Sequence, residues 1–217
     1  MVFEHLVVGM LQTNCYILGD EQTRQAVVID PGGDFKRIAD RIVRFELDLV
    51  AILNTHAHFD HVAAAWSLKS KLGGRIFLHE NDRPILQHSM VAAGNVYAVD
   101  PHSPSVRIDA SFRDGDLLPF GAIRLQVLET PGHTPGHVSF YFADAGIVFV
   151  GDTIFAGSIG RTDLPGGSFE QLKKSVLERI FLLPPDTLIL PGHGPKTTVQ
   201  HEKRTNPFFG GGRFFRI

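Results

Sequence analysis

The sequence predicts an α/β protein, a four-layer αββα sandwich of two related halves that forms a single domain over residues 1–217. Short apolar, β-branched runs alternate with amphipathic segments, which is typical of strands and helices in layers. The order strand, strand, helix, strand, helix occurs in outline twice, with a break near residue 110. In each half a hydrophobic strand leads into a polar segment with histidine, so two sheets packed face to face would bring these strand ends to a common edge.

Composition and charge fit an ordinary globular protein and disfavour several classes of function. The chain is 43% hydrophobic and 20% charged, so it can bury a full core. Its net charge is −2, so we expect neither nucleic acid nor a membrane as a partner. The sequence shows no signal-peptide pattern and no stretch that could cross a bilayer, which predicts a soluble, cytoplasmic protein. The single cysteine, Cys15, excludes an internal disulfide, and we interpret it as a small buried hydrophobe.

The first half contains short apolar runs bounded by Gly, Pro, Asn or Asp, and we expect them to be strands. These runs are 6–8, 15–18, 26–29, 49–53 and 75–78. Large apolar residues recur at spacings of three and four over 35–45, which predicts an amphipathic helix. A second helix is expected to follow Asp60 and to run through Ala63 to Leu72, because the Gly73-Gly74 pair would end it there.

The second half shows the same kinds of signal. Strands are expected at 123–128, 138–142, 147–150 and 187–190. Ser168 and Gln171 form a capping-box signature that predicts the start of a helix, and a final helix is expected from Thr197 to about Thr205.

The 90–104 segment lacks periodicity, and we interpret it as a long loop that is either a functional cover or simply mobile. The Phe-rich C-terminal tail is expected to pack on its own domain, with a subunit interface as the alternative.

The strongest chemical signal is the segment Thr-His-Ala-His-Phe-Asp-His at 55–61, which follows an expected buried strand. His56 and His58 are two residues apart, so in an extended backbone their imidazoles leave the same face and can bind one ion. Asp60 and His61 follow where a helix begins and can point to a neighbouring position. Four candidate ligands in six positions therefore predict two adjacent metal sites, with a histidine-rich solvated loop as the alternative.

Three further candidate ligands lie where strands end. They are His133 in TPGHT, Asp152 in VFVGDT and His193 in LPGHG. Each has a glycine beside it, which lets the backbone turn sharply close to an ion. One such residue alone is more typical of a structural role, but the three together complete the donor set of a two-metal site. Five other histidines show no ligand spacing and are expected to be structural: His5, His79, His88, His102 and His201.

In order and approximate spacing, these motifs resemble those of the metallo-β-lactamase superfamily over essentially the whole chain. The segments TNCYILGD, VVIDPGG and FAGSIGRTDLPGGS resemble more narrowly the glyoxalase II group, the hydroxyacylglutathione hydrolases, and in particular its short bacterial members without a C-terminal helical domain. The resemblance implies the metallo-β-lactamase fold, and it selects His133 rather than His137 as a ligand. It implies a first metal on His56, His58 and His133, a second on Asp60, His61 and His193, and a bridging Asp152.

The resemblance implies a hydrolase with two divalent metal ions. Zinc is the expected metal, with iron or manganese as alternatives. Two ions would lower the pKa of a shared water towards neutrality, and Asp60 would be the catalytic residue that orients the resulting metal-bound hydroxide towards a thioester carbonyl. The substrate implied is a glutathione conjugate, S-lactoylglutathione, which would give lactate and glutathione. True β-lactamases of the superfamily usually have other residues at the bridging position and often a cysteine at the second site. This chain has neither feature, so penicillin hydrolysis is not expected.

Other residues are candidates for orienting the ligands or binding the substrate. Asp30 ends a buried strand, where a carboxylate is costly without partners, so it would orient a ligand histidine or the ligand loop, with a turn aspartate as the alternative. By resemblance, Arg161 lies in the segment that contacts glutathione, and it could pair with a glycine carboxylate or with Asp163. Lys196 is a further substrate-binding candidate, with an ordinary surface charge as the alternative. Tyr97, in the long loop, is another.

Two other functions stay open at this point. One is an iron-dependent persulfide dioxygenase of the same superfamily, with a single iron on His56, His133 and Asp152. The other is a non-catalytic metal-binding protein with a vestigial site, against which the intact donor set argues. The sequence does not define the oligomeric state, and a homo-oligomer is left open.

Overall fold

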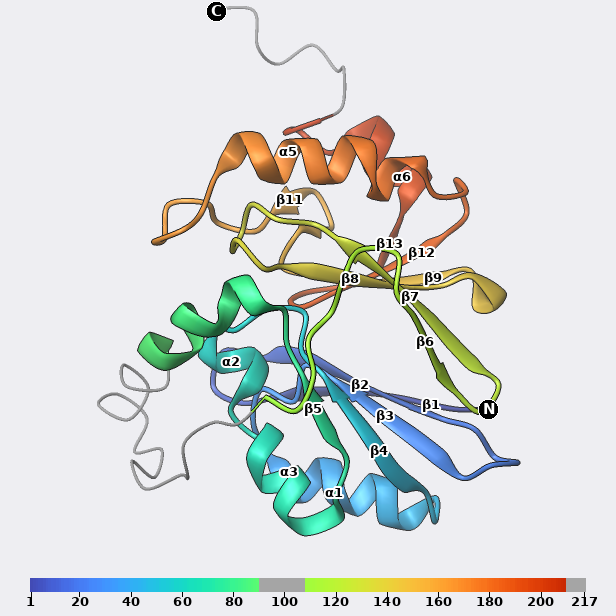
Figure 1. The fold of residues 1–217 in the computed structure, drawn as a ribbon. Coiled ribbons are helices and arrows are strands. Elements are labelled where there is room, and N and C mark those ends of the chain that lie inside the picture. The colour runs from blue at the N-terminus through green and yellow to red at the C-terminus, as the bar shows by residue number, and fades with distance from the viewer. Residues whose placement is uncertain (90–107, 210–217) are drawn as a thin grey trace, which may run out of the picture.

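Two β-sheets pack face to face between two layers of helices (Figure 1). This architecture comes from a computed structural model that describes residues 1–89 and 108–209. The predicted four-layer α/β sandwich is therefore confirmed. The expectations for Tyr97, His102, the 90–104 loop and the tail beyond 209 lie outside the described residues. Within these residues no helix is long and apolar enough to cross a membrane.

The first sheet contains five strands in the order β1-β2-β3-β4-β5. β1 to β3 pair antiparallel, whereas β3, β4 and β5 are parallel neighbours. The parallel pairing places the carboxyl ends of β3, β4 and β5 at one edge of the sheet. The strands are β1 (Val2–Val8), β2 (Thr13–Gly19), β3 (Gln25–Ile29), β4 (Asp48–Leu53) and β5 (Arg75–Phe77).

The second sheet contains six strands in the order β13-β12-β9-β8-β7-β6. β9 and β12 are parallel, so they also end at one edge, and the other pairs are antiparallel. A separate two-stranded hairpin, β10 (Ile154–Phe155) and β11 (Ser158–Ile159), follows β9. The sheet strands are β6 (Leu117–Phe120), β7 (Ile123–Glu129), β8 (Val138–Phe142), β9 (Ile147–Gly151), β12 (Leu188–Pro191) and β13 (Thr197–Thr198).

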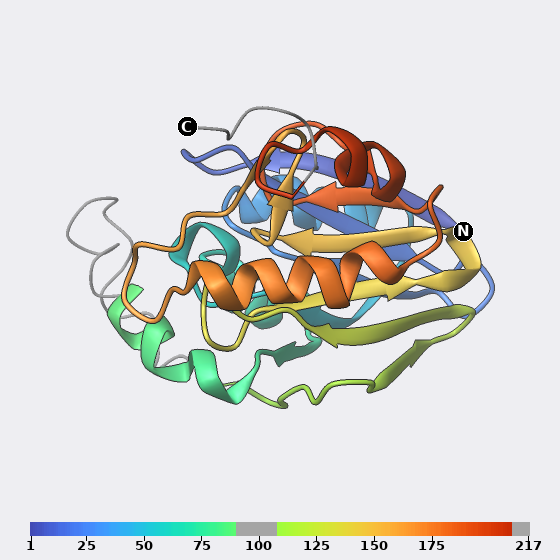
Figure 2. The ribbon, with the colours of Figure 1, turned by 90° about the horizontal axis from the view of Figure 1, so that it is seen from above.

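Helices cover the outer face of each sheet. α1 and α3 lie below the first sheet in Figure 1, and α5 and α6 lie above the second; from above, α5 runs along the strands that it covers (Figure 2). Residues 83–89 are helical as well. The helices are α1 (Phe35–Arg44), α2 (Phe59–Val62), α3 (Ala65–Leu72), α5 (Phe169–Glu178) and α6 (Val199–Thr205), and the 3₁₀ turns are η1 (Glu80–Asp82), η2 (Ala143–Ala145) and η3 (Ile180–Leu182).

The apolar core is divided into layers by the alternation of side chains along the strands. In β3, Val28 faces the helices below the sheet, whereas Val27 and Ile29 face the second sheet. The layer between the sheets also contains Phe140, whose ring lies 5.2 Å from that of Phe112. Because the central strands are buried on both faces, their sequences read as continuous apolar runs, which explains why they could be predicted.

The structure differs from the expectations at several element boundaries. The single helix expected from just after Asp60 to Leu72 is divided into α2 and α3, because the Ala64 amide donates to the Pro31 carbonyl (2.9 Å) instead of continuing the helix. The final helix begins at Val199, with Thr198 as its cap, since residues 197–198 form β13. β6, β10, β11 and β13 were not predicted, because short strands carry little periodicity.

Hydrogen bonds join the two sheets at the edge where the parallel strands end. The Val138 amide donates to the Thr55 carbonyl (2.8 Å), and the Asn14 amide donates to the Gly192 carbonyl (2.7 Å). The loop that follows β4 is thereby held against β8, and the loop that follows β12 is held against β2. The histidine-rich segments of the two halves therefore meet at a single place.

Truncation of the inter-sheet core should lower the stability of the fold. We expect Phe140→Ala to lower the free energy of unfolding by about 3–5 kcal/mol, because it leaves a cavity between the sheets. Phe169→Ala is the control, since this ring is 38% exposed, and it should cost less than about 1 kcal/mol. Urea unfolding measures both values, and equal losses would contradict this account of the core.

Candidate metal centre

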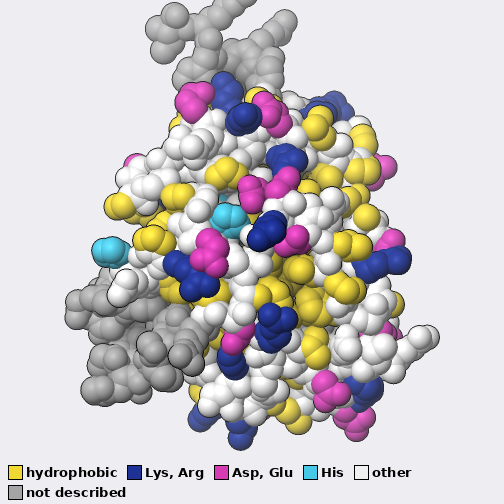
Figure 3. Space-filling model, in the orientation of Figure 1, with side chains coloured by type: hydrophobic (Ala, Val, Ile, Leu, Met, Phe, Trp, Pro, Cys, Tyr) yellow, Lys and Arg dark blue, Asp and Glu magenta, His cyan; other side chains and the backbone are white. Residues whose placement is uncertain are grey.

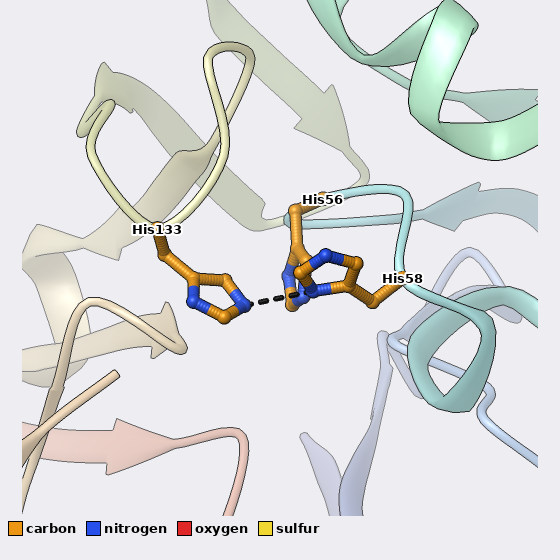
Figure 4. A group of neighbouring side chains, drawn as sticks. All are labelled: His56, His58 and His133. Carbon is orange, nitrogen blue, oxygen red and sulfur yellow. Dashed lines mark hydrogen bonds between the residues drawn. The ribbon is translucent and has the colours of Figure 1, made fainter. Parts of the chain in front are cut away.

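A first group of candidate ligands is formed by His56, His58 and His133 (Figure 4). His56 and His58 lie on the loop between β4 and α2, and His133 faces them from the loop between β7 and β8. The Nδ1 atom of His58 lies 2.8 Å from Nε2 of His133. One nitrogen of each ring lies within 4.8 Å of the others, a spacing that one metal ion can span.

A second group, Asp60, His61 and His193, lies beside the first. Asp60 and His61 belong to α2, and His193 follows β12 in the other half. Nε2 of His193 lies 3.1 Å from Oδ2 of Asp60, and Nε2 of His61 lies 3.5 Å from the same oxygen. Three donor atoms of two residue types therefore converge here too.

Asp152 lies between the two groups, directly after β9. Its Oδ1 is 3.4 Å from Nε2 of His61, whereas its Oδ2 is 3.6 Å from Nε2 of His133 and 3.7 Å from Nε2 of His193. One carboxylate thus faces histidines of both groups. The structure therefore brings together all seven residues that the sequence nominated as ligands.

Unpartnered polar atoms show that the donor set suits a metal centre. Buried polar atoms in native proteins nearly always have a hydrogen-bond partner. Among the described residues, Nε2 of His56, Nε2 of His61 and Oδ1 of Asp152 are buried without one, and all three lie in this cluster. A divalent cation would satisfy these atoms, because imidazole nitrogens and carboxylate oxygens are common ligands of such ions.

The environment keeps most of the donors in a form that binds cations. Burial, reinforced by neighbouring imidazoles, lowers the pKa of His56, and burial together with His133 lowers the pKa of His58 to about 4. Burial alone would raise the pKa of Asp60, but nearby His61 and His193 lower it to about 2. Neutral imidazoles and ionised carboxylates are the states that metal binding requires.

His61 and His193 behave differently from His56 and His58. Burial opposes protonation of both rings, but the carboxylates of Asp152, Asp60 and Asp30 raise the pKa of His61, and those of Asp60 and Asp152 raise the pKa of His193. A proton on either ring must leave before a metal binds, so metal affinity should fall as the pH falls.

The second nitrogen of several rings is held by the surrounding protein. Nδ1 of His56 lies 3.0 Å from the Thr55 hydroxyl, and Nδ1 of His133 lies 2.7 Å from the Arg161 carbonyl. These contacts turn Nε2 of both rings towards the centre. Fixing the second nitrogen sets the orientation of a metal-binding histidine.

Asp30 contacts both the ligand loop and His61. Its Oδ1 accepts from the Thr55 amide and its Oδ2 from the Thr55 hydroxyl, both at 2.7 Å, and its Oδ2 lies 3.0 Å from Nδ1 of His61. Its backbone has a φ of 51°, which asparagine and aspartate tolerate better than most residues. These contacts place Asp30 where it can orient the ligand loop and the His61 ring.

His137 is buried behind the centre. Its Nε2 accepts from the Asp152 amide (3.1 Å), and its Nδ1 lies 3.0 Å from the Thr130 hydroxyl. Its ring stacks on that of His56, with centroids 5.0 Å apart. Both nitrogens are therefore engaged, which is consistent with the structural role expected for it.

Two of the substrate-binding candidates, Arg161 and Lys196, lie among the described residues. The Arg161 guanidinium makes two hydrogen bonds to Asp163, at 2.8 and 2.9 Å, and both side chains are exposed. Lys196 is also exposed. Sequence reasoning missed the backbone contact of Arg161 with His133, and it missed Thr13, whose hydroxyl donates to Oδ2 of Asp60 (3.1 Å). No sequence signal identifies these contacts, because the partners are 28 and 47 residues apart.

A hollow of about 650 Å³ lies beside His58. Its wall is mainly apolar and includes Pro84, Ile85, Pro135 and Leu164. A pocket of this size next to a reactive centre is typical of a site for a small molecule.

Two mixed sheets flanked by helices, with a binuclear His/Asp metal site where their parallel strands end, define a metallo-hydrolase. The comparison with known families agrees with this class. The sequence model of the metallo-β-lactamase superfamily matches residues 8–193, and the chain belongs to this superfamily.

Relatives that match this chain over nearly their whole length include proteins named as hydrolases. The chain is 36% identical over 209 residues to the hydroxyacylglutathione hydrolase GloC of Haemophilus influenzae, covering 96% of this chain and 98% of the relative. It is 39% identical over 212 residues to the probable metallo-hydrolase YqgX of Bacillus subtilis, covering 97% and 99% of the two chains.

Solved structures show the same fold. The B3 metallo-β-lactamase BLEG-1 has a TM-score of 0.88 at 36% identity, covering 97% of this chain and 100% of that one. TTHA1623, solved in a di-iron-bound form, has a TM-score of 0.84 at 39% identity, covering 95% and 100%. ETHE1 from Myxococcus xanthus has a TM-score of 0.80 at 31% identity, covering 95% and 84%.

Asp30 should support metal binding through its contacts with the ligand loop and His61. We expect Asp30→Asn to weaken binding of at least one metal ion about 10–100-fold, since the amide cannot reproduce all three contacts. Asp34→Asn is the matched control, because Asp34 also has a positive φ but is exposed. Titration of metal-free protein with Zn²⁺ in competition with a chelating dye measures both, and parental affinity in Asp30→Asn would contradict this role.

Proposed function

We propose that this metallo-hydrolase cleaves thioesters, with S-lactoylglutathione as substrate and lactate and glutathione as products. The observation that carries the proposal is the position of Asp152, whose two oxygens face histidines of two separate donor groups. That arrangement suits a pair of cations and a hydrolytic reaction between them. The match to a relative named hydroxyacylglutathione hydrolase, over 98% of its length, supports the choice of substrate.

The proposed ligands follow the two groups. His56, His58 and His133 would hold one ion, and a second set would hold the other, with Asp152 shared. The second set is Asp60, His61 and His193. We propose zinc as the metal, with iron or manganese as alternatives, since sites of this composition accept several divalent ions. The di-iron form of TTHA1623 makes iron a real candidate.

The chain would contribute orientation and charge to the reaction. When bound, two divalent cations supply Lewis acidity and lower the pKa of water towards 7. Asp60 would be the catalytic residue: its carboxylate stays ionised near neutral pH and would accept a hydrogen bond from the attacking water. The Thr13 hydroxyl, which donates to Oδ2 of Asp60 (3.1 Å), would fix this carboxylate. The leaving thiolate is a weak base, so no strong general acid is needed.

Local contacts would recognise the substrate. On the face drawn in Figure 3, basic and acidic side chains of the described residues are interspersed, so charged groups of a small substrate would be bound singly. We propose that Arg161 exchanges Asp163 for a glutathione carboxylate and that Lys196 and Tyr97 give further contacts. The apolar hollow beside His58 could hold a carbon chain of the substrate. We propose that the protein binds neither nucleic acid nor membranes. A homo-oligomer stays an alternative to a monomer.

A persulfide dioxygenase with one iron on His56, His133 and Asp152 is the second candidate. The di-iron relative favours it by showing that similar chains bind iron. It leaves four of the seven converging donors without a role, which is why we prefer the two-metal hydrolase. A vestigial, non-catalytic site is the third candidate, and the complete donor set argues against it.

A direct assay of metal content and turnover tests the proposal. We expect about two metal ions per chain, and turnover of S-lactoylglutathione that exceeds that of glutathione persulfide or a β-lactam. Asp152→Ala should lower kcat on the order of 10³-fold or more, because several kcal/mol of charge stabilisation would be lost.

Asp144→Ala is the control for this variant, since Asp144 is an exposed acid paired with Arg124. Oxygen uptake with persulfide, together with no thioester turnover, would select the dioxygenase instead. Unchanged hydrolysis in Asp152→Ala would rule out a mechanism in which this carboxylate is shared by two ions.

Arg161 should affect substrate binding more than the chemical step. We expect Arg161→Ala to raise KM for S-lactoylglutathione about 3–10-fold with kcat little changed, since the guanidinium is exposed and its pairing is screened by water. Arg124→Ala is the control, because Arg124 is another exposed arginine in an ion pair. Steady-state kinetics give both constants, and a parental KM in Arg161→Ala would remove this residue from the proposed binding site.

A further inference from the structure

Asp82 is a fully buried carboxylate to which the proposed reaction gives no role. It accepts three hydrogen bonds from two other segments of the chain. Its Oδ2 accepts from the Ala57 amide (2.9 Å) and the Thr134 hydroxyl (2.8 Å), and its Oδ1 accepts from the Gly136 amide (2.6 Å). These donors are 25, 52 and 54 residues away in the sequence, so Asp82 joins distant segments.

The two segments are the loops that carry the first donor group. Ala57 lies between His56 and His58, and Thr134 directly follows His133. Figure 4 shows these two loops facing each other across the three imidazoles. One oxygen of Asp82 therefore binds the backbone at the centre of one loop and the side chain next to the ligand of the other.

Asp82 is itself held firmly in the η1 turn. Its amide donates to the His79 carbonyl (3.0 Å), and Nδ1 of His79 accepts from the Asn81 amide (3.2 Å). Gly136 allows the close approach, because a Cβ atom there would lie only 2.7 Å from the amide nitrogen and from Oδ1 of Asp82. The backbone around the carboxylate therefore leaves little room for it to move.

We propose that Asp82 is a positioning residue that sets the spacing between His133 and the pair His56 and His58. It acts through the two loops and contacts neither the metal nor the substrate. Without it, the two amides and the Thr134 hydroxyl would be buried and unpaired, and the loops would shift to find new partners. This inference rests on the ligand set proposed above.

Zinc binding tests the inference without any assay of turnover. Metal-free proteins are titrated with Zn²⁺ in competition with a chelating dye. We expect Asp82→Ala to bind one of its two zinc ions about 10–100-fold more weakly than the parent, the range found for residues that orient ligands. Asp82→Asn should fall in between, because its one oxygen can still accept from Ala57 and Thr134. The His193→Ala variant retains the first donor group. When Asp82→Ala is added to it, the affinity for the remaining zinc ion should fall by the same factor.

Asp20 provides a matched control. It is also a buried carboxylate with three donors, the Gln22 and Ala122 amides and the Thr23 hydroxyl, but it lies at the other end of β2 from the metal centre. Asp20→Ala should lower the midpoint of thermal unfolding and leave zinc affinity at the parental value.

Zinc affinity decides between a positioning role and a purely structural one. Parental zinc affinity in Asp82→Ala, with thermal stability lowered as in Asp20→Ala, would overturn the inference. If Asp82→Ala does not fold, Asp82→Asn decides in the same way: weaker binding supports the inference and parental binding overturns it. If the parent itself binds fewer than two zinc ions, the proposed ligand set is wrong, and the inference that rests on it is overturned too. If the parent binds two ions and only the effect of Asp82→Ala is missing, the inference alone is overturned.

Discussion

The arrangement of the metal centre depends on one carboxylate, Asp152, buried among imidazoles from both halves of the molecule. Its charge favours cationic partners on both sides, and its position at the end of β9 is fixed by the parallel pairing of β9 with β12. Burying a carboxylate is unfavourable unless its charge is compensated. The histidines around it, with two unpartnered Nε2 atoms, provide that compensation only in part. A pair of cations would complete it.

Around this centre, ordinary backbone and side-chain groups control how each ligand is presented. The Thr55 hydroxyl, the Asp30 carboxylate and the Arg161 carbonyl each contact the ring nitrogen that faces away from the centre. His137 accepts a hydrogen bond from the backbone amide of Asp152 and so helps to hold this residue in place. The geometry of the donors is thus set by residues that never touch an ion, which is usual for metal sites in proteins.

The sequence was sufficient to predict the fold class and the clustering of the donors, for physical reasons. Strands buried on both faces read as continuous apolar runs, and ligands at the ends of parallel strands meet at one edge. It was not sufficient for Asp82 or Thr13, because a buried aspartate in a surface-like segment and a threonine in a strand have no distinctive pattern. Short strands such as β10 and the division between α2 and α3 depend on tertiary hydrogen bonds, which local periodicity does not record.

The division of the donors between the halves has a consequence for folding. His56, His58, Asp60 and His61 come from the first half of the chain, whereas the other donors come from the second: His133, Asp152 and His193. Neither half carries the whole set, so bound ions would link the two halves through their ligands. Such ions bind only the assembled state and therefore add their binding free energy to its stability. The heat tolerance of this protein in a cell would then follow the supply of metal as well as the quality of its apolar core.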